Sequence, residues 1–342
     1  QLFKIHNESR KLTKLQTLED LCFYLECDKF RLQLNALKPV YYQYKIRKNK
    51  VSFRQIEDPA DELKKMQRKL NDGLQAVYYY QRPPAVFGFC INTNHETERN
   101  IVTNAGQHVK ARSLLNIDLK DFFHQISKSK VKQIYESIQP RLDNETSDCV
   151  ASLCTFKGRL PMGAPTSPVL SNFACIELDT ELVALCRNMG LTYTRYADDL
   201  SFSGVNVISP EDKELIEDTI KAHRFIINPD KVRLFAEGEI KTITGLQIRD
   251  GQVKLPEKYY HLLRLEINRL QHTKEVENRY HTGMSQKKLK LMEQEIMGKL
   301  NFARMVPGEL EIKEELEFQF AKALEPPDEA ESANWLDFPY IF

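Results

Sequence analysis

The chain has 342 residues, of which 42% are hydrophobic and 28% charged. This composition is that of an ordinary globular protein and excludes a chain that is disordered over most of its length. No apolar run approaches the ~20 residues that a bilayer-spanning helix needs, and no signal peptide is visible at the start. We therefore expect a cytoplasmic protein with no membrane partner. Because the first residue is Gln1 and not Met, the sequence leaves open whether its N-terminus is complete.

The net charge of +1 hides an uneven distribution of charge. Residues 306–342 contain ten acidic and two basic residues and carry −8, so that residues 1–305 carry +9. Such asymmetry between two parts of a chain favours a nucleic-acid partner for the basic part. The seven cysteines show no CxxC spacing, and they predict buried thiols in a reducing environment, with neither a disulfide framework nor a zinc site.

The hydrophobic pattern predicts the elements in chain order. The first part is expected to form a helix over 8–36, a β-hairpin over 40–56 that turns near 48–50 and is broken at 58–59, and a helix over 60–80. Next come a strand over 114–119, a helix over 130–142, an irregular segment over 160–168, a helix over 169–190, and two strands that flank residues 198–199. A helix over 209–223 with Ser209 as its N-cap precedes short strands over 224–228, 231–235 and 241–248. A turn at 250–251 leads to two basic helices over 257–280 and 285–304.

Three aspartates stand in apolar surroundings. Asp118 lies in "NIDL" near the end of its predicted strand, and Asp198 and Asp199 lie side by side in "YADDL". A buried, unpaired carboxylate costs several kcal/mol, which a bound cation would offset. Mg²⁺ suits such carboxylates, and two ions roughly 3.5–4 Å apart clamp the attacking and leaving oxygens of a phosphoryl transfer. On these residues alone, capping of a turn or pairing with a lysine remains an open alternative.

"YADD" at 196–199 resembles the signature of reverse transcriptases, and the resemblance continues in order over roughly residues 40–305. The other matching segments are "FRQIEDP" (53–59), "IDLKDFFHQI" (117–126), "LPMGAPTSPVLSNFACIELD" (160–179), "INPDKVRL" (227–234) and "TITGLQI" (242–248). "NAGQH" (104–108) is similar to the N-A-x-x-H motif of bacterial retron reverse transcriptases, and "ITG" (243–245) to their V-T-G.

The resemblance implies an α+β protein with the right-hand polymerase fold, made of fingers, a palm with an antiparallel sheet flanked by helices, and a helical thumb. We expect N-terminal helices and fingers over 1–113, the palm with an inserted fingers segment over 114–253, the thumb over 254–305 and an acidic extension over 306–342. The implied enzyme is an RNA-directed DNA polymerase that copies its own structured noncoding RNA into a branched RNA–DNA hybrid. Its implied partners are that RNA, the cDNA product, dNTPs and a separate effector protein of anti-phage defence.

The resemblance also implies residue roles. Asp118, Asp198 and Asp199 would be catalytic and, with Leu119, would bind two Mg²⁺ ions, for which Mn²⁺ is a substitute. The nucleotide-binding set would be Arg54, Phe123, Gly163, Ala164 and Lys231. Phe123 would be the gate that refuses the 2′-OH of ribonucleotides, with Phe122 facing the core. Thr244, Gly245 and Leu246 would form the primer grip.

The implied RNA-binding residues are Asn104, His108, Lys287, Lys288 and Lys290. Asn104 and His108 are one helical turn apart and could equally cap a loop. Met162 stands where the family usually has Gln, which removes an amide contact. The acidic extension has no counterpart in the family, and we expect it to point away from the RNA. Two rival interpretations stay open: another bacterial reverse transcriptase, either defence-associated or group II intron-like, and a nonenzymatic RNA-binding scaffold on the same fold.

Overall fold

A computed structural model of the chain describes residues 1–47, 53–280 and 286–325. The chain divides into two compact units, Gln1–Glu239 and Ile240–Phe342. Within the described ranges, no helix combines the length and the apolar character that crossing a membrane requires. The expected hairpin turn near 48–50 lies outside the described residues.

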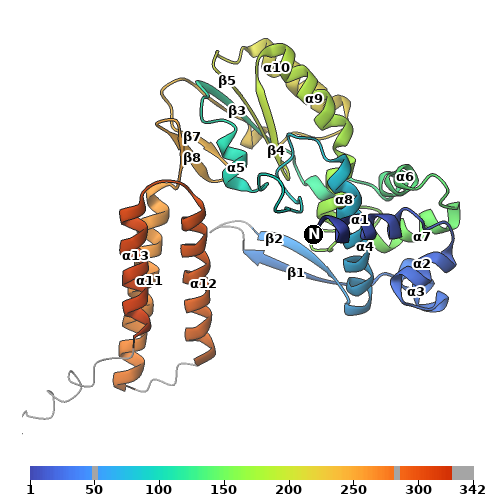
Figure 1. The fold of residues 1–342 in the computed structure, drawn as a ribbon, viewed down its shortest axis with the longest axis horizontal. Coiled ribbons are helices and arrows are strands. Elements are labelled where there is room, and N and C mark those ends of the chain that lie inside the picture. Colours follow the sequence, from blue (N-terminus) through green and yellow to red (C-terminus); the bar gives the residue numbers. More distant parts are fainter. Residues whose placement is uncertain (48–52, 281–285, 326–342) are drawn as a thin grey trace, which may run out of the picture. The chain divides into compact units, whose positions relative to one another are not determined.

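The first unit begins with short helices, and the single helix expected over 8–36 is wrong. The observed helices are α1 (Leu2–Leu12), α2 (Leu18–Leu25) and α3 (Lys29–Leu37) (Figure 1). Thr17 and Asp20 form a capping box that starts α2. Glu26 ends α2 in the left-handed conformation, and the side chain of Asp28 caps α3 by accepting from the backbone of Arg31. Local capping residues therefore divide residues 8–36 into separate helices, although the apolar spacing predicts one continuous helix.

A β-hairpin and a long helix follow, as expected. Strands β1 (Tyr41–Arg47) and β2 (Phe53–Pro59) pair in antiparallel fashion, with Tyr41 opposite Pro59. The strand is not broken at Asp58 but runs to Pro59, because a proline at the end of a two-stranded ribbon costs no ladder hydrogen bond. Helix α4 (Asp61–Gln81) buries one side, including Leu63, Leu70 and Leu74.

An antiparallel sheet of four strands lies at the centre of the first unit. Its spatial order is β4 (Thr192–Tyr196), β5 (Asp199–Gly204), β3 (Ser113–Asp118) and β6 (Arg233–Phe235). The expected strand at 224–228 is wrong. Only Ile227 pairs there, through an isolated bridge to Leu119, before a 3₁₀ turn over Pro229–Lys231. The strand expected over 231–235 is shortened to β6 by the same turn.

The other helices of the first unit are α5 (Ile101–Gly106), α6 (Lys128–Ile138), α7 (Asn144–Cys154), α8 (Ser167–Ala174), α9 (Ile176–Met189) and α10 (Pro210–Ala222), with a 3₁₀ helix η1 over Phe122–Gln125. Of these, α5 and α9 pack against β4 and α10 packs on α9, whereas α6 and α7 pack on each other and lie away from the sheet (Figure 1). The helix expected over 169–190 is two helices, because the Cys175 N–H donates to the carbonyl of Asn172, three residues earlier, and tightens the chain there. The predicted N-cap Ser209 is confirmed.

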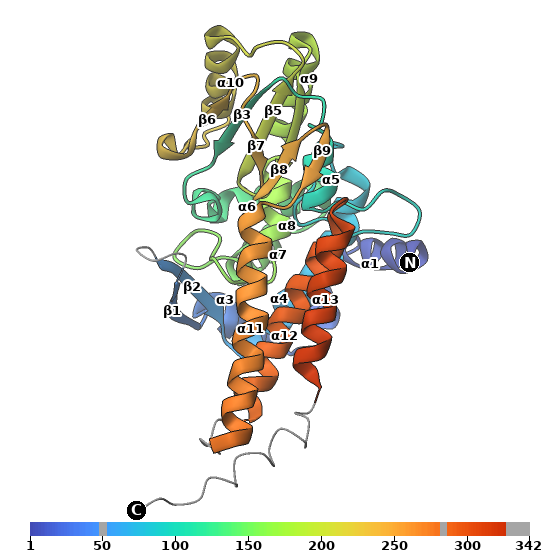
Figure 2. The same cartoon turned by 90° about the vertical axis from the view of Figure 1, so that its left-hand side faces the viewer.

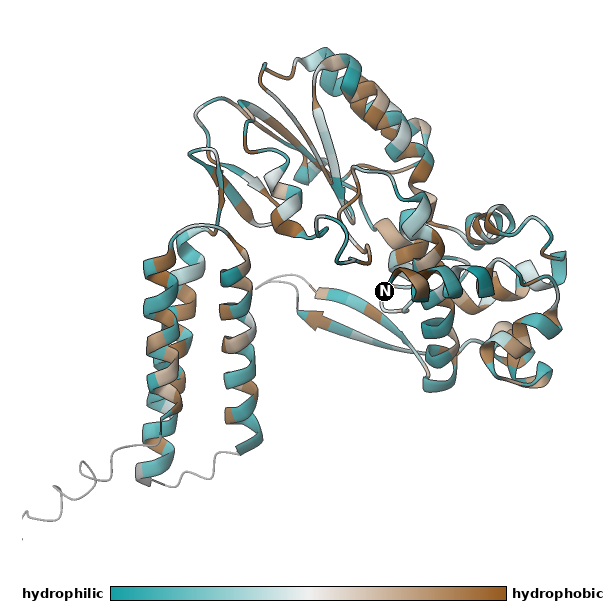
Figure 3. Cartoon of the chain, viewed as in Figure 1, coloured by the Kyte–Doolittle hydropathy of each residue, from teal (hydrophilic) through white to brown (hydrophobic). Residues whose placement is uncertain are grey.

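A contiguous apolar core joins the helices to the sheet. It includes Leu21, Leu74, Leu115, Leu170 and Phe202, all without measurable exposure. Hydrophobic positions alternate with hydrophilic ones along the strands and along α9 and α10 (Figure 3). Helices α9 and α10 bury one face, whereas the central strands β3 and β5 are buried along almost their whole length.

The second unit opens with a small antiparallel meander of β7 (Lys241–Ile243), β8 (Leu246–Arg249) and β9 (Gln252–Lys254). The single strand expected over 241–248 is wrong, because Thr244 and Gly245 both take positive φ, 47° and 85°, and turn the chain. Positive φ at both central residues is typical of a two-residue hairpin. The turn expected at Asp250 and Gly251 is confirmed and joins β8 to β9.

Three helices complete the second unit and lie side by side (Figure 2). They are α11 (Glu257–Tyr280), α12 (Gln286–Met305) and α13 (Leu310–Leu324). Helix α13 was not expected, and it belongs to the acidic extension. Its Glu315 pairs with Arg264 at 3.1 Å, and its Glu317 with Arg304 at 2.5 Å. The beginning of the extension is thus built into the helical unit, whereas 326–342 lie outside the described residues.

Candidate functional site

The three aspartates singled out in the sequence come together where the two central strands of the sheet, β3 and β5, meet at one end. Asp118 ends β3 directly opposite Asp199, which begins β5. The Leu119 N–H donates to the carbonyl of Asp198 at 3.0 Å, so that the backbone after β3 is fixed to the turn between β4 and β5. Segments 80 residues apart are thus joined at the acids.

Lys231 and Asn228 hold the side chain of Asp118, which is 5% exposed. The Lys231 ammonium lies 2.5 Å from Oδ2, and the Asn228 amide donates to Oδ1 at 3.1 Å. Burial opposes the charge on Lys231, but the hydrogen bond and charge of Asp118 outweigh it, and the pKa of Lys231 is raised. Asp198 and Asp199 add to this effect. A lysine that is held charged therefore stands next to the acids.

Asp198 carries a charge that its surroundings penalise. Burial is the largest cause and raises its pKa, and the negative charge of Asp118 raises it further. A backbone hydrogen bond and the charges of Lys231 and Arg54 offset this only in part. In the described part of the chain, no three His, Cys, Asp or Glu side chains are arranged as a group that could hold a metal ion. The residues nevertheless fit a hard divalent cation, since they offer carboxylate oxygens and one carboxylate whose charge lacks full compensation.

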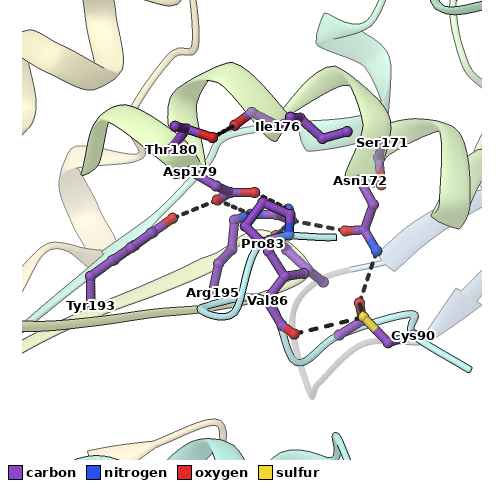
Figure 4. A network of polar contacts seen from close by, with 12 residues as sticks. Pro83, Val86, Cys90, Ser171, Asn172, Ile176, Asp179, Thr180, Tyr193 and Arg195 are labelled. Carbon is purple, nitrogen blue, oxygen red and sulfur yellow. Dashed lines mark hydrogen bonds and ion pairs between the residues drawn. The ribbon is translucent and has the colours of Figure 1, made fainter. Parts of the chain in front are cut away.

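A buried ion pair supports the turn that carries Asp198 (Figure 4). Arg195 has no exposed surface, and its Nε and Nη2 donate to the two carboxylate oxygens of Asp179 at 2.8 and 2.7 Å. The hydroxyl of Tyr193 donates to the same carboxylate at 2.8 Å. Burial disfavours the charged guanidinium, but Asp179 outweighs it, and the pKa of Arg195 is raised. Arg195 is therefore a fixed cation inside the core.

The third nitrogen of Arg195 connects the ion pair to the turn. Its Nη1 donates at 3.1 Å both to the carbonyl of Ala197 and to Oδ1 of Asn172. Ala197 has φ 58°, a left-handed conformation that only its surroundings can stabilise. The Asn172 amide donates onward to the carbonyl of Gly88 at 3.0 Å. A Cβ on Gly88 would lie 2.5 Å from the Ala197 nitrogen, so only glycine fits there.

Sequence reasoning missed this network. Asp179 and Arg195 stand at the end of "IELD" and inside "YTRYA", where charged residues interrupt apolar runs. The same signal identified Asp118. It was overlooked here because the two partners belong to different elements, a helix and a strand, and only the fold makes them a pair.

The two adjacent phenylalanines of η1 differ in burial, as expected. Phe122 is buried at 4% exposure, whereas Phe123 is half-buried. Their ring centroids are 5.6 Å apart. Phe122 also contacts Phe225, and Phe123 also contacts Phe89, each with ring centroids 6.1 Å apart. The gate role of Phe123 stays a prediction, and its partial exposure is compatible with it.

The remaining nucleotide-binding candidates lie on or beside β2. Arg54 is exposed on that strand, and Ala164 is buried. Gly163 has φ 134°, and a Cβ there would lie 2.9 Å from the Glu57 carbonyl oxygen. The Glu57 N–H donates to the carbonyl of Met162 at 2.8 Å. This contact uses the backbone, so the replacement of Gln by Met does not affect it.

An ion pair fixes the hairpin on this loop. Glu57 is 1% exposed, and Arg159 donates to both of its carboxylate oxygens at 2.8 and 3.0 Å. Burial alone would raise the pKa of Glu57, but Arg159 outweighs burial and the pKa is lowered. The bidentate geometry holds β2, which carries Arg54, against Arg159.

The "NAGQH" pair is internal. Asn104 and His108 are each 1% exposed. The ring nitrogens of His108 bond to the hydroxyls of Ser203 and Thr194, both at 2.7 Å, and so tie β4 to β5. Burial lowers the pKa of His108 to about 4, which keeps the ring neutral at pH 7. His108 therefore has a structural role between two strands of the sheet and does not cap a loop, and RNA binding by the pair stays a prediction.

The second unit contains the other candidates. Lys287, Lys288 and Lys290 are exposed on α12, and none forms an ion pair with another residue in the described ranges. Thr244 and Gly245 form the β7–β8 turn, and Leu246 is buried at the start of β8. The role of these three as a primer grip stays a prediction.

Comparison with known proteins identifies relatives. Residues 46–295 match the profile of the family described as reverse transcriptase (RNA-dependent DNA polymerase). The chain is similar to the retron Mx162 reverse transcriptase of Myxococcus xanthus, with 32% identity over 240 residues, 61% of this chain and 47% of that protein. It is also similar to the retron Ec86 reverse transcriptase of Escherichia coli, with 30% identity over 223 residues, 64% of this chain and 65% of that protein.

The aligned part thus spans about half to two thirds of the length of these relatives. Among solved structures, telomerase from Candida albicans aligns with a TM-score of 0.46 and 11% identity, over 83% of this chain and 55% of that one, a similarity too low to carry an argument. The family match and the observed helices and antiparallel sheets confirm the expected α+β class and right-hand polymerase fold. The relatives confirm the expected resemblance to bacterial retron reverse transcriptases.

His108 predicts a pH-dependent stability. Its folded pKa of about 4 lies below the ordinary value near 6.5. Its contribution is therefore complete above pH 6.5 and is lost as the pH falls toward 4. Urea denaturation should show a loss of about 2 kcal/mol from this residue between pH 7 and pH 5. His108→Gln should remove this pH-dependent loss of unfolding free energy. The control His272→Gln, at an exposed position, should retain it. Equal pH profiles for the wild type and both variants would contradict the assignment.

Removing one partner of the Arg195–Asp179 pair should destabilise the protein more than removing both. Arg195→Met leaves a buried carboxylate without its cation and should lower the free energy of unfolding by about 3–5 kcal/mol. The double variant Arg195→Met/Asp179→Leu removes both charges and should recover most of that loss. Urea denaturation measures both. A double variant as unstable as the single one would mean that the geometry of the pair, and not an unpaired charge, decides the stability.

Proposed function

Because the chain belongs to the reverse transcriptase family, we propose that it is an RNA-directed DNA polymerase of retron type. The observation that carries the proposal is the meeting of Asp118 with the Asp198–Asp199 turn, beside a charged lysine, in a chain of this family. Its substrates would be dNTPs. Its template would be its own structured noncoding RNA, primed from a guanosine 2′-OH, and its product a branched RNA–DNA hybrid.

Three acids would hold the metal ions. Asp118, Asp198 and Asp199 supply carboxylates, and Leu119 has only its backbone carbonyl to offer. We propose two Mg²⁺ ions, replaceable by Mn²⁺. When bound, such ions stabilise the charge that develops on the attacking and leaving oxygens of a nucleotidyl transfer. Since carboxylates must be ionised to bind a cation, the raised pKa of Asp198 makes this binding weaken as the pH falls.

The other residues of the site would bind and select the nucleotide. Lys231 keeps its positive charge beside the acids, where it would neutralise the leaving pyrophosphate. Arg54 is exposed on a strand that Glu57 and Arg159 hold in place, and it would contact the triphosphate. Phe123 would lie beneath the sugar and exclude a 2′-OH. Gly163 and Ala164 lie on the loop next to β2, and they would line the nucleotide-binding site.

The helices of the second unit would contact the nucleic acid. Residues 254–304 contain eleven Lys and Arg against six acids. A duplex of RNA template and new DNA is A-like, and proteins read such a duplex through its backbone more than through its bases. Lys287, Lys288 and Lys290 form an exposed basic group suited to phosphates. A role in anti-phage defence, with a separate effector, completes the proposal, as the resemblance of the sequence motifs implies.

Sequencing of the nucleic acid that copurifies with the full chain would test the retron assignment. A covalent RNA–DNA species is the expected result. Linear cDNA alone would indicate another bacterial reverse transcriptase, and RNA without any DNA would indicate a binding scaffold.

Asp198→Asn should abolish metal-dependent DNA synthesis. The amide keeps the shape of the side chain but removes a ligand charge, and we expect a loss on the order of a thousandfold in primer extension. The melting temperature should not fall, because burial already penalises the charged form of Asp198. Asp218→Asn, an exposed carboxylate on α10, is the matched control. Near wild-type extension by the Asp198 variant would refute the metal assignment.

Charge reversal at Lys287, Lys288 and Lys290 should weaken RNA binding and flatten its salt dependence. Each lost phosphate contact removes about 0.7–0.9 from the slope of log affinity against log salt. Filter binding at several salt concentrations measures both quantities. Deletion of residues 325–342 is the comparison and should leave RNA affinity nearly unchanged. An equal loss from the deletion would place the end of the chain against the RNA.

A further inference from the structure

Phe89 takes a backbone conformation that a phenylalanine rarely adopts. Its φ is 58°, in the left-handed region, where the Cβ of a bulky residue is crowded. Such a conformation persists only where the surroundings enforce it, and it is found preferentially at functional sites. Neither the family motifs nor the site described above assigns a role to this residue.

The backbone around Phe89 is held from two sides. The Asn172 amide donates to the carbonyl of Gly88 at 3.0 Å, and the Gln75 amide donates to the carbonyl of Phe89 at 3.1 Å. Figure 4 shows Asn172 reaching from its helix to this loop, next to Cys90. Gly88 also packs without a side chain against the Ala197 nitrogen. The loop is thus fixed to the turn that carries Asp198.

The strained conformation places the Phe89 ring against Phe123. The two ring centroids are 6.1 Å apart, with 33° between the ring planes. Phe122 contacts Phe123 at 5.6 Å, with 41° between the planes. Phe123 therefore has one aromatic neighbour that belongs to the core, Phe122, and one, Phe89, that belongs to the loop. Such ring pairs, with centroids 4.5–7 Å apart, are attractive beyond simple burial.

We propose that Phe89 is a positioning residue for sugar discrimination, which holds the Phe123 ring where a ribose 2′-OH would clash with it. The inference rests on the proposed polymerase function and on Phe123 as the gate. Phe89 acts through Phe123 and not by contact with the sugar. Because the Gly88–Phe89 loop also touches Ala197, the gate and the metal-binding turn share one rigid support.

Loss of the Phe89 ring frees the Phe123 side chain to rotate into the vacated space. Room for the 2′-OH then opens in a fraction of the molecules. We expect the ratio of kcat/KM for dNTP to that for rNTP to fall about threefold to tenfold, less than after Phe123→Ala, which removes the gate itself. The kcat/KM for dNTP should stay within about twofold, since the acids and Lys231 are untouched.

The test uses the full chain in RNA-templated primer extension with dNTP or rNTP. Phe89→Gly removes the ring, and glycine is the residue best suited to φ 58°, so that the loop keeps its path. Phe89→Tyr keeps the ring and should restore discrimination. Phe156→Leu is the control, because Phe156 belongs to another ring pair, with Tyr41, whose ring centroids are 4.5 Å apart with 31° between the planes. The double variant Phe89→Gly/Phe123→Ala should discriminate no worse than Phe123→Ala alone.

The outcomes separate the inference from its premises. A wild-type chain that incorporates no dNTP refutes the proposed function, and unchanged discrimination in Phe123→Ala refutes the gate and the inference with it. If Phe123→Ala loses discrimination but Phe89→Gly does not, the inference alone is wrong. An additive loss in the double variant would also overturn it, because Phe89 would then act independently of Phe123. Should Phe89→Gly not fold, Phe89→Leu takes its place and is judged in the same way.

Discussion

The ion pair between Arg195 and Asp179 is the interaction on which the candidate site depends. A guanidinium without exposed surface must have its donors satisfied, and here they bind the Asp179 carboxylate, the Asn172 amide oxygen and the Ala197 carbonyl. Because such a network is costly to break in part, it fixes helix α9, strand β4 and the turn after it as one body. The aspartates therefore stand on a rigid support.

Three residues near this support have a strained, left-handed backbone conformation. Ala197 and Phe89 both have φ 58°, and Asp121, just before the two phenylalanines of η1, has φ 47°. Ala197 directly precedes Asp198, Asp121 directly precedes the phenylalanines of η1, and Phe89 contacts Phe123 through its ring. Backbone strain of this kind needs compensation from its surroundings, and the buried hydrogen bonds of Arg195 and Asn172 supply it at the first two positions.

Charge is handled differently in the second unit. The acids of α13 are partly neutralised by arginines of α11 and α12, whereas Lys287, Lys288 and Lys290 on α12 are left exposed. The acidic character of residues 306–342 is thus partly internal to the helical unit. Net charge over a segment of sequence says little about the potential outside it, because ion pairs between helices remove part of it.

The sequence by itself indicated the family: an acid in "NIDL" and two in "YADDL", in a fixed order with other segments, resemble reverse transcriptases, and the family match confirms this. It also determined the hairpin, α4, α10 and the strands around the acids, because their patterns are local. It did not determine the division of 8–36 and 169–190 into separate helices, nor helix α13. Only the tertiary structure decided that Asp179 pairs with Arg195, that His108 lies inside the fold and that Phe89 meets Phe123. Those contacts join residues from different elements, and their free energy depends on burial, which no stretch of sequence specifies alone.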